Sequence, residues 1–405
     1  MQHVVLVAPY FSDNMRHCVR CFAELPDCKL GIVSQEPADK LPPALRSRLA
    51  AYERIGDPAQ AANLVAGAAA IQKQWGRIDR IEGYLEMLQV PIAEARDALA
   101  VDGMGAEVAK NFRDKNRMKD VLRKAGVPVA RQALVHGADD VRTFVQKVGY
   151  PIVLKPLAGF GARNTQRVTD EATLAVALNA LLPSASNPAQ AEEFVQGEEH
   201  TFEAVTIGGK VVWSSSTEYI PSPLQVLENP WMQYALILPR EMHLSHVQAF
   251  APVNATALAA LGVRDGLSHM EWFLRADGTA VVSEVGARPP GANIMPLLQA
   301  AHGADPWAAW AQLMVHRSWH FPERRFAAGT IFLRAKGGGD TVRAVEGLDA
   351  MRARLGQALV DMKVPQPGQP RSQHYEGDGW VLVHHPETKG AIAALRAVLD
   401  TVTVV

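Results

Sequence analysis

The sequence lacks any apolar run long enough to span a membrane, and its first residues lack the basic start and long apolar core of a secretion signal. We therefore expect a cytoplasmic protein. An excess of one charge is lacking too, because 41 basic and 42 acidic residues leave a formal charge of -1. This balance gives no broad electrostatic case for binding nucleic acid or an anionic membrane, so small molecules are the expected partners.

Cysteine is scarce, with three residues in 405. Cys18 and Cys21 have the spacing of a metal-binding or redox pair. The total is odd, however, and a zinc site would need a further ligand such as His17 or His3. The apolar residues around the pair have the spacing of an ordinary helix face. We therefore predict reduced structural cysteines.

A glycine fingerprint after the first predicted strand is also lacking. Strands over residues 3–10 and 29–33, with a helix over 16–24 between them, predict an α/β opening. A dinucleotide site at this point is unsupported, because no glycine-rich turn follows the strand. With 48% hydrophobic and 20% charged residues, the chain suits a soluble globular protein of two or three domains.

The most informative pattern that is present is an acidic hairpin. Asp277-Gly278 between two strand-like runs predicts a two-residue type I′ turn. That turn pairs Ala276 with Thr279 and sets Glu271 directly opposite Glu284. A four-residue turn would shift the register by two residues and place Glu271 against Val282 instead.

Two opposed carboxylates need a positive partner. With Cβ atoms ~5 Å apart and an effective dielectric of about 20, they repel by roughly 3 kcal/mol. Mg²⁺ is commonly held by one or two carboxylates together with substrate phosphates, so a metal answers the need. An exposed hairpin with two solvated glutamates is the alternative.

Alternation along the strands predicts the rest of the hairpin's inner face. His269 and Phe273 share a face with Glu271, and Val282 and Gly286 lie across from them with Glu284. Arg288 falls on the same side as Glu284 and adds a planar cation for a carboxylate or phosphate.

A lysine at a strand end forms a second candidate feature. Residues 151–155 predict a strand that ends at Lys155, just before a loop that contains Gly159 and Gly161. A lysine beside glycines suits a phosphate clamp, although such turns are more often only structural.

Three further expectations concern local structure. Asp114 and Asp139 are predicted to cap helices that end at Gly126 and Gly149. Residues 219–238, rich in proline and aromatic side chains, predict a loop over a pocket.

In their order along the chain, these features resemble the ATP-grasp superfamily, and most closely the bacterial L-amino acid ligases of the bacilysin-synthetase type. The resemblance is carried by Lys115, Lys155, Gly159, Gly161, Glu192, Val195, Glu199, Glu271, Glu284 and Arg288. It implies an N-terminal Rossmann-like α/β domain (1–110), an ATP-grasp lid (111–190), a catalytic core (191–316) and a C-terminal α+β subdomain (317–405). Such enzymes join two amino acids through an acyl phosphate and release ADP and phosphate.

The resemblance also implies a role for each residue. Lys115 and Lys155 would contact ATP phosphates under the Gly159 and Gly161 loop. Glu192 and Val195 would meet adenine through their backbone, and Glu199 would hold ribose. Glu271 and Glu284 would bind Mg²⁺, with Mn²⁺ as an alternative, Arg288 would stabilise the acyl phosphate, and His269 would lie beside the amino acid site.

The sequence departs from the commoner ATP-grasp pattern at Gly286, where many members have a metal-ligating asparagine. One metal position would then rest on two glutamates and water. A biotin carboxylase-like or purine-pathway ligase, and a non-catalytic ATP-binding protein, stay open as alternatives, as does a homodimer.

Overall fold

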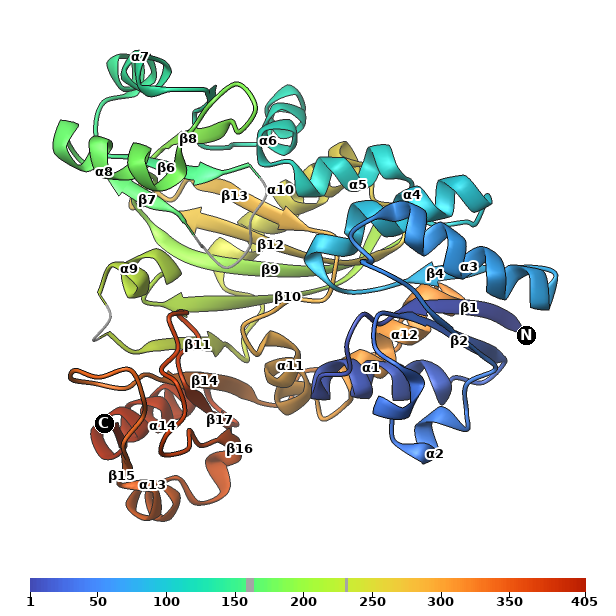
Figure 1. Cartoon of the computed structure of the whole chain (residues 1–405). Coiled ribbons are helices and arrows are strands. Elements are labelled where there is room, and N and C mark those ends of the chain that lie inside the picture. The colour runs from blue at the N-terminus through green and yellow to red at the C-terminus, as the bar shows by residue number, and fades with distance from the viewer. Residues whose placement is uncertain (158–163, 230–231) are drawn as a thin grey trace.

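The computed structural model describes residues 1–157, 164–229 and 232–405 (Figure 1). In the described part, the strands form a parallel N-terminal sheet, a small antiparallel sheet, a large antiparallel sheet and a two-stranded ribbon. No helix in these residues is both long and apolar enough to cross a membrane.

The N-terminal region forms a parallel sheet in the order β3-β2-β1-β4, as its α/β opening predicts. The two central strands, β1 and β2, each contain a short apolar run, which is typical of strands covered by helices on both faces. The elements are β1 (Gln2–Val7), α1 (Asp13–Ala23), β2 (Cys28–Ser34), η1 (Ala38–Lys40), α2 (Pro43–Arg46), β3 (Ala51–Arg54), α3 (Ala61–Trp75), β4 (Arg80–Glu82), η2 (Glu86–Leu88) and α4 (Gln89–Leu99). On α1, Cys18 and Cys21 are buried and form no disulfide, in agreement with the structural role predicted for them.

A small sheet in the order β5-β8-β6-β7 lies above the large sheet (Figure 1). Its elements, with the helices before and around it, are α5 (Ala106–Arg113), α6 (Lys115–Lys124), β5 (Gln132–Val135), α7 (Ala138–Val148), β6 (Ile152–Pro156), β7 (Gln166–Val168), α8 (Glu171–Leu181) and β8 (Ala189–Glu193). The Asp114 side chain caps α6, as predicted, by accepting from the backbone of Asn116 and Arg117. The prediction for Asp139 was wrong, because α7 starts after Gly137 and Asp139 lies in its first turn.

The large sheet has the order β13-β12-β9-β10-β11-β14-β17-β16. Its elements and surrounding helices are β9 (Glu198–Ile207), β10 (Lys210–Ile220), α9 (Pro223–Glu228), β11 (Tyr234–Leu238), α10 (Ser245–Leu261), β12 (Gly266–Leu274), β13 (Ala280–Gly286), α11 (Ile294–His302), α12 (Pro306–His316), β14 (Ala327–Leu333), α13 (Leu348–Leu355), η3 (Gly356–Ala358), β16 (Leu359–Lys363), β17 (Gly379–His385) and α14 (Thr388–Thr401). The ribbon pairs β15 (Val345–Glu346) with β18 (Thr403–Val404). One sheet therefore runs through both the proposed catalytic core and the proposed C-terminal subdomain.

The hairpin of β12 and β13 sets Glu271 opposite Glu284, as predicted, but by a different route. Leu274 pairs with Ala280, and the backbone N–H of Arg275 donates to Thr279, so the loop is one residue longer than a type I′ turn. A bulge between Glu271 and Trp272 then restores the register.

The same bulge corrects the expected inner face of β13. Val281, rather than Val282, lies opposite Phe273. Val282 pairs with Trp272 and packs in the core cluster on the other face of the sheet. The extra residue of the bulge reverses the alternation, which strict period two could not anticipate.

Residues 219–238 are more regular than the predicted loop. Tyr219 belongs to β10, residues 223–228 form α9, and residues 234–238 form β11. Tyr219, Pro223 and Leu224 nevertheless line a cavity, so the expectation of a segment beside a pocket is confirmed.

Candidate functional site

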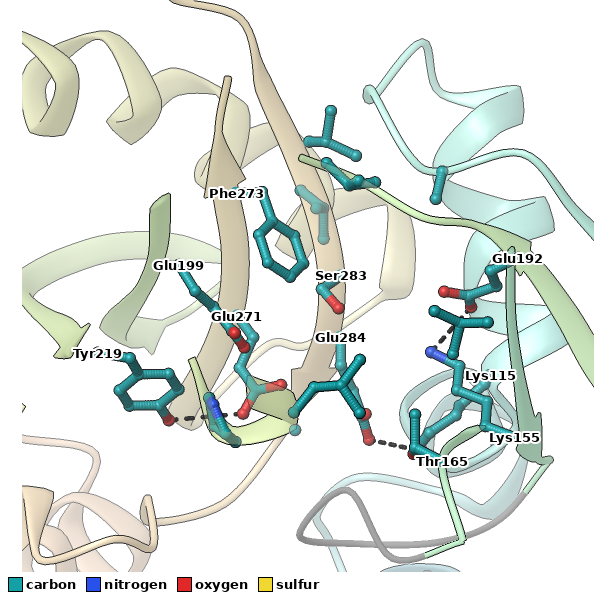
Figure 2. Close-up of a pocket in the computed structure, with 18 of the residues that line it drawn as sticks. Lys115, Lys155, Thr165, Glu192, Glu199, Tyr219, Glu271, Phe273, Ser283 and Glu284 are labelled. Carbon is teal, nitrogen blue, oxygen red and sulfur yellow. Dashed lines mark hydrogen bonds and ion pairs between the residues drawn. The ribbon is translucent and has the colours of Figure 1, made fainter. Parts of the chain in front are cut away.

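A cavity of about 190 Å³ lies between the small sheet and the large sheet. Figure 2 shows Glu199, Glu271 and Phe273 on one side, facing Lys115, Lys155 and Glu192 on the other. Its charged lining residues are Glu86, Lys115, Lys119, Lys155, Glu192, Glu193, Glu199, His269, Glu271, Glu284 and Arg288. The structure therefore brings together all of the described residues that the sequence nominated.

The two opposed glutamates each have a cationic neighbour. Lys115 Nζ lies 2.5 Å from Glu284 Oε1, and His269 Nε2 lies 3.7 Å from Glu271 Oε1. Tyr219 adds a long hydroxyl contact of 3.5 Å to Glu271 (Figure 2). Burial alone would raise the pKa of Glu271, but His269 and Lys115 outweigh it and hold this pKa below its usual range.

His269 lies between two carboxylates. Its Nδ1 is 2.9 Å from Oε1 of Glu203, which is fully buried on the neighbouring strand β9. Burial would lower the pKa of the ring, but hydrogen bonds with Glu203 and Glu271 outweigh this effect and raise it to about 9. At neutral pH, His269 is therefore a cation and a donor rather than a free base.

Glu192 lies at the centre of a second buried charge cluster. Its Oε1 is 2.7 Å from Lys119 Nζ and 2.9 Å from Lys155 Nζ, and it accepts from the side chain of Gln190. Burial would raise the pKa of Glu192, but the two lysines lower it to about 2. Lys119, 1% exposed, has its own pKa lowered to about 8, chiefly by burial.

Arg288 reaches from the loop after β13 to a carboxylate of the N-terminal region. Its Nε pairs with Glu86, which also lies 2.5 Å from Nη1 of Arg113. Its Nη1 donates to the backbone carbonyl of Pro289 at 2.8 Å. The guanidinium is thus fixed in position at the cavity wall, next to the acidic pair.

One end of the cavity is apolar. Ala130, Val195 and Val281 form a buried cluster against which Phe273 packs. Glu199 lies directly opposite Phe273 on β9 and faces the cavity. Burial, and then the charge of Glu271, raise the pKa of Glu199 well above its ordinary value. The end therefore combines a flat apolar slot with a hydrogen-bonding carboxyl group.

The donor atoms near the acidic pair fit a hard divalent cation. Glu271 and Glu284 offer carboxylate oxygens, which are the ligands of Mg²⁺ and Mn²⁺. Gly286 lies opposite His269 on the same hairpin and lines the cavity, so it contributes no side-chain ligand. A cation here would rely on two glutamates and water.

Several residues of the site were not found from the sequence. Glu86, Lys119, Glu203 and Tyr375 come from four separate segments. Only Lys119 carried a usable signal, because it follows Lys115 by four residues and so shares its helix face. Gly159 and Gly161, the predicted phosphate loop, lie outside the described residues.

Comparison with known proteins confirms the resemblance. Residues 120–292 match the family model of the ATP-grasp domain. The alanine–anticapsin ligase of Bacillus subtilis strain 168 is 26% identical over 247 residues, 56% of this chain and 52% of that protein. An L-arginine-specific L-amino acid ligase of Bacillus subtilis is 26% identical over 60% of this chain and 59% of its own. The chain thus spans little more than half the length of these curated relatives.

Solved structures show the same fold. An L-amino acid ligase from Bacillus licheniformis superposes with a TM-score of 0.78 at 19% identity, covering 100% of this chain and 98% of that one. An N5-carboxyaminoimidazole ribonucleotide synthetase from Thermotoga maritima gives a TM-score of 0.70 at 15% identity, covering 100% and 99%. At these identities the likeness establishes an ATP-grasp fold and leaves the reaction to be argued from the site.

Proposed function

We propose that this protein is an ATP-dependent carboxylate–amine ligase that joins two amino acids, or an amino acid and a related carboxylate, through an acyl phosphate. The observation that carries the proposal is the convergence of an opposed glutamate pair, two lysines and a fixed arginine on one cavity with an apolar end. The sequence similarity to the two amino acid ligases supports the choice of substrate class.

The proposed nucleotide site follows the polarity of the cavity. The adenine ring would enter the apolar slot of Val195, Phe273 and their neighbours, against the backbone of Glu192 and Val195. Glu199 would bind ribose, and Lys115 and Lys155 would meet the phosphates. Because both lysines now contact carboxylates, nucleotide binding would exchange these ion pairs for phosphate contacts.

Glu271 and Glu284 would hold one or two Mg²⁺ or Mn²⁺ ions, which would neutralise charge on the phosphates. Arg288 would donate to the oxygens of the acyl phosphate and of the tetrahedral adduct, where negative charge develops. His269, held protonated between Glu203 and Glu271, would orient the amino acid by donating a hydrogen bond rather than by removing its proton.

The proposal is tested by phosphate release in a matrix of amino acid pairs with MgATP. We expect ADP and phosphate to form only when amino acids are present, together with a ligated product detected by mass spectrometry. Release of AMP and pyrophosphate would contradict an acyl phosphate. Bicarbonate-dependent turnover without amino acids would favour a carboxylase-type ligase, and ATP binding with no turnover for any substrate would favour a non-catalytic protein.

A further inference from the structure

The face of the large sheet turned away from the cavity carries a second group of ligating side chains. His200 on β9 pairs directly with Glu218 on β10 and with Trp272 on β12, so these three side chains lie on one face. His246, in the first turn of α10, covers them with its ring centroid 5.1 Å from that of His200. One ligand atom each from His200, Glu218 and His246 lies within 4.8 Å of the other two.

Buried ring nitrogens of this group have no hydrogen bonds, although only the His200 side chain is buried as a whole and His246 is half-buried. Both ring nitrogens of His200 and Nε2 of His246 have no hydrogen-bond partner within the described part of the chain. The His200 side chain is 3% exposed, and the Glu198 carboxylate lies 3.8 Å from its Nε2, beyond hydrogen-bond distance. Buried polar atoms are nearly always partnered, and a cation that binds one nitrogen of each ring would satisfy two of these three atoms, for which the described residues supply no partner.

The chemistry of the donors indicates which ligand that is. Two imidazoles and a carboxylate are a donor set for zinc and similar borderline divalent ions, whereas Mg²⁺ prefers oxygen alone. A metal binds imidazole in its neutral form. Glu198, largely exposed at the edge of the group, is within reach as a further ligand.

We propose that His200, His246 and Glu218 form a binding site for a zinc-class divalent cation, completed by Glu198 or water. The site joins β9 and β10 to α10. Glu199 is adjacent to His200 on β9, and Tyr219 is adjacent to Glu218 on β10. Both side chains face the candidate ATP cavity. The cation would therefore stabilise the strands that carry part of the nucleotide site, from the opposite side of the sheet.

A second cluster, between α1 and the start of α12, provides a contrast. His17, Cys21 and Asp305 also lie close enough to hold an ion. Here, however, the groups already satisfy one another: His17 Nε2 lies 2.8 Å from Asp305, whose other oxygen caps α12, and Arg20 contacts Nδ1 of His17. These contacts leave no need for a cation, so we propose no metal site at this cluster.

The test is zinc binding by the full-length, chelator-stripped protein, measured by calorimetry with excess Mg²⁺ to occupy oxygen-ligand sites. A His17→Ala background removes any contribution from the second cluster. We expect one zinc per chain, with affinity at least tenfold weaker in His246→Ala and in Glu218→Gln. His243→Ala, which removes an exposed histidine three residues before His246, should bind zinc as the background protein does.

Two readouts separate a site from a general loss of structure. Zinc should raise the thermal unfolding midpoint of the background protein by a few degrees and leave that of His246→Ala unchanged. Cu²⁺ should quench tryptophan fluorescence through Trp272, which stacks on His200 at 4.8 Å, and His246→Ala should reduce this quenching. Absence of zinc binding, or equal affinity in the background, His246→Ala and Glu218→Gln proteins, would overturn the proposal.

Discussion

Two acidic groups face the same cavity, and the protein balances their charges in different ways. Glu192 receives two buried lysines on a single oxygen, and its pKa falls to about 2. Glu271 and Glu284 are instead balanced by a lysine from α6 and a histidine from their own hairpin. The first arrangement is a closed ion cluster. The second leaves carboxylate oxygens on the cavity wall that a cation could use.

We expect the largest loss of activity when either of the two opposed glutamates is changed. Glu271→Gln and Glu284→Gln should each abolish MgATP-dependent turnover, because a metal would lose a charged ligand. The fold should remain, since either change also removes repulsion between the two carboxylates. Turnover and the unfolding midpoint are measured together, with the exposed Glu107→Gln as the matched control. Near-normal activity in either variant would show that the pair does not hold a catalytic metal.

Arg288→Ala should reduce turnover on the order of 100- to 1000-fold while ATP affinity stays nearly unchanged, because its proposed role is to stabilise developing charge. Arg288→Lys should not restore activity, since lysine lacks the planar fork. Arg113→Ala is the matched control because it contacts the same Glu86 but lies outside the cavity lining. If Arg288→Ala loses ATP binding in step with activity, the arginine belongs to the nucleotide site.

The closed cluster predicts the opposite behaviour at Glu192. Glu192→Gln leaves Lys119 and Lys155 buried without their carboxylate, which should destabilise the fold by about 3 kcal/mol. Chemical denaturation compares this loss with Glu271→Gln, for which we expect a smaller loss, because the nearest cationic atom to Glu271 is His269 Nε2 at 3.7 Å. An equal loss in both variants would remove the distinction between the two acidic groups.

Lys155→Ala should weaken ATP binding at least tenfold, because a lysine at the end of β6 provides a point charge for phosphate. Lys119→Met changes the other lysine of the same cluster, which is more deeply buried, and should affect stability more than ATP affinity. Nucleotide titration of both variants gives the comparison. An unchanged ATP dissociation constant in Lys155→Ala would assign that lysine a structural role only.

The last prediction is a pH dependence of stability at His269. Its pKa rises from an ordinary value near 6.5 to about 9 on folding, so the protonated ring stabilises the native state fully below about pH 6.5. This contribution, roughly 3 kcal/mol at most, should disappear as the pH rises through 9. The difference in unfolding free energy between wild type and His269→Gln should therefore shrink from pH 6.5 to 9.5. A constant difference over that range would contradict the assigned charge.

The sequence predicts the centre of the site better than its surroundings. Glu271, Glu284 and Arg288 lie within one hairpin and its exit, where pairing and alternation are local rules. The pairing was correct although the turn was not, because a longer loop and a bulge cancel in register. Beside the bulge, the backbone N–H of Val282 donates to the carbonyl oxygen of Pro128, a contact that strand patterns do not encode.

The remainder required tertiary structure. Glu86 meets Arg288 across about 200 residues, and Glu203 meets His269 across 66. Isolated glutamates in a 3-10 turn or a strand have no motif that would single them out. The α/β opening and the cap at Asp114 were predictable, because continuous apolar strands and side-chain caps are properties of short segments.

The central claim, activation of a carboxylate by transfer of the terminal phosphoryl group, is tested most directly by oxygen-18 transfer. An amino acid labelled with oxygen-18 in its carboxylate is turned over with unlabelled MgATP and a second amino acid. Our account predicts one oxygen-18 atom in the released inorganic phosphate. The carboxylate oxygen that attacks phosphorus becomes the bridging oxygen of the acyl phosphate, and it leaves with phosphate when the amine attacks the acyl carbon. Label in AMP, or turnover with no label in phosphate, would contradict the acyl phosphate.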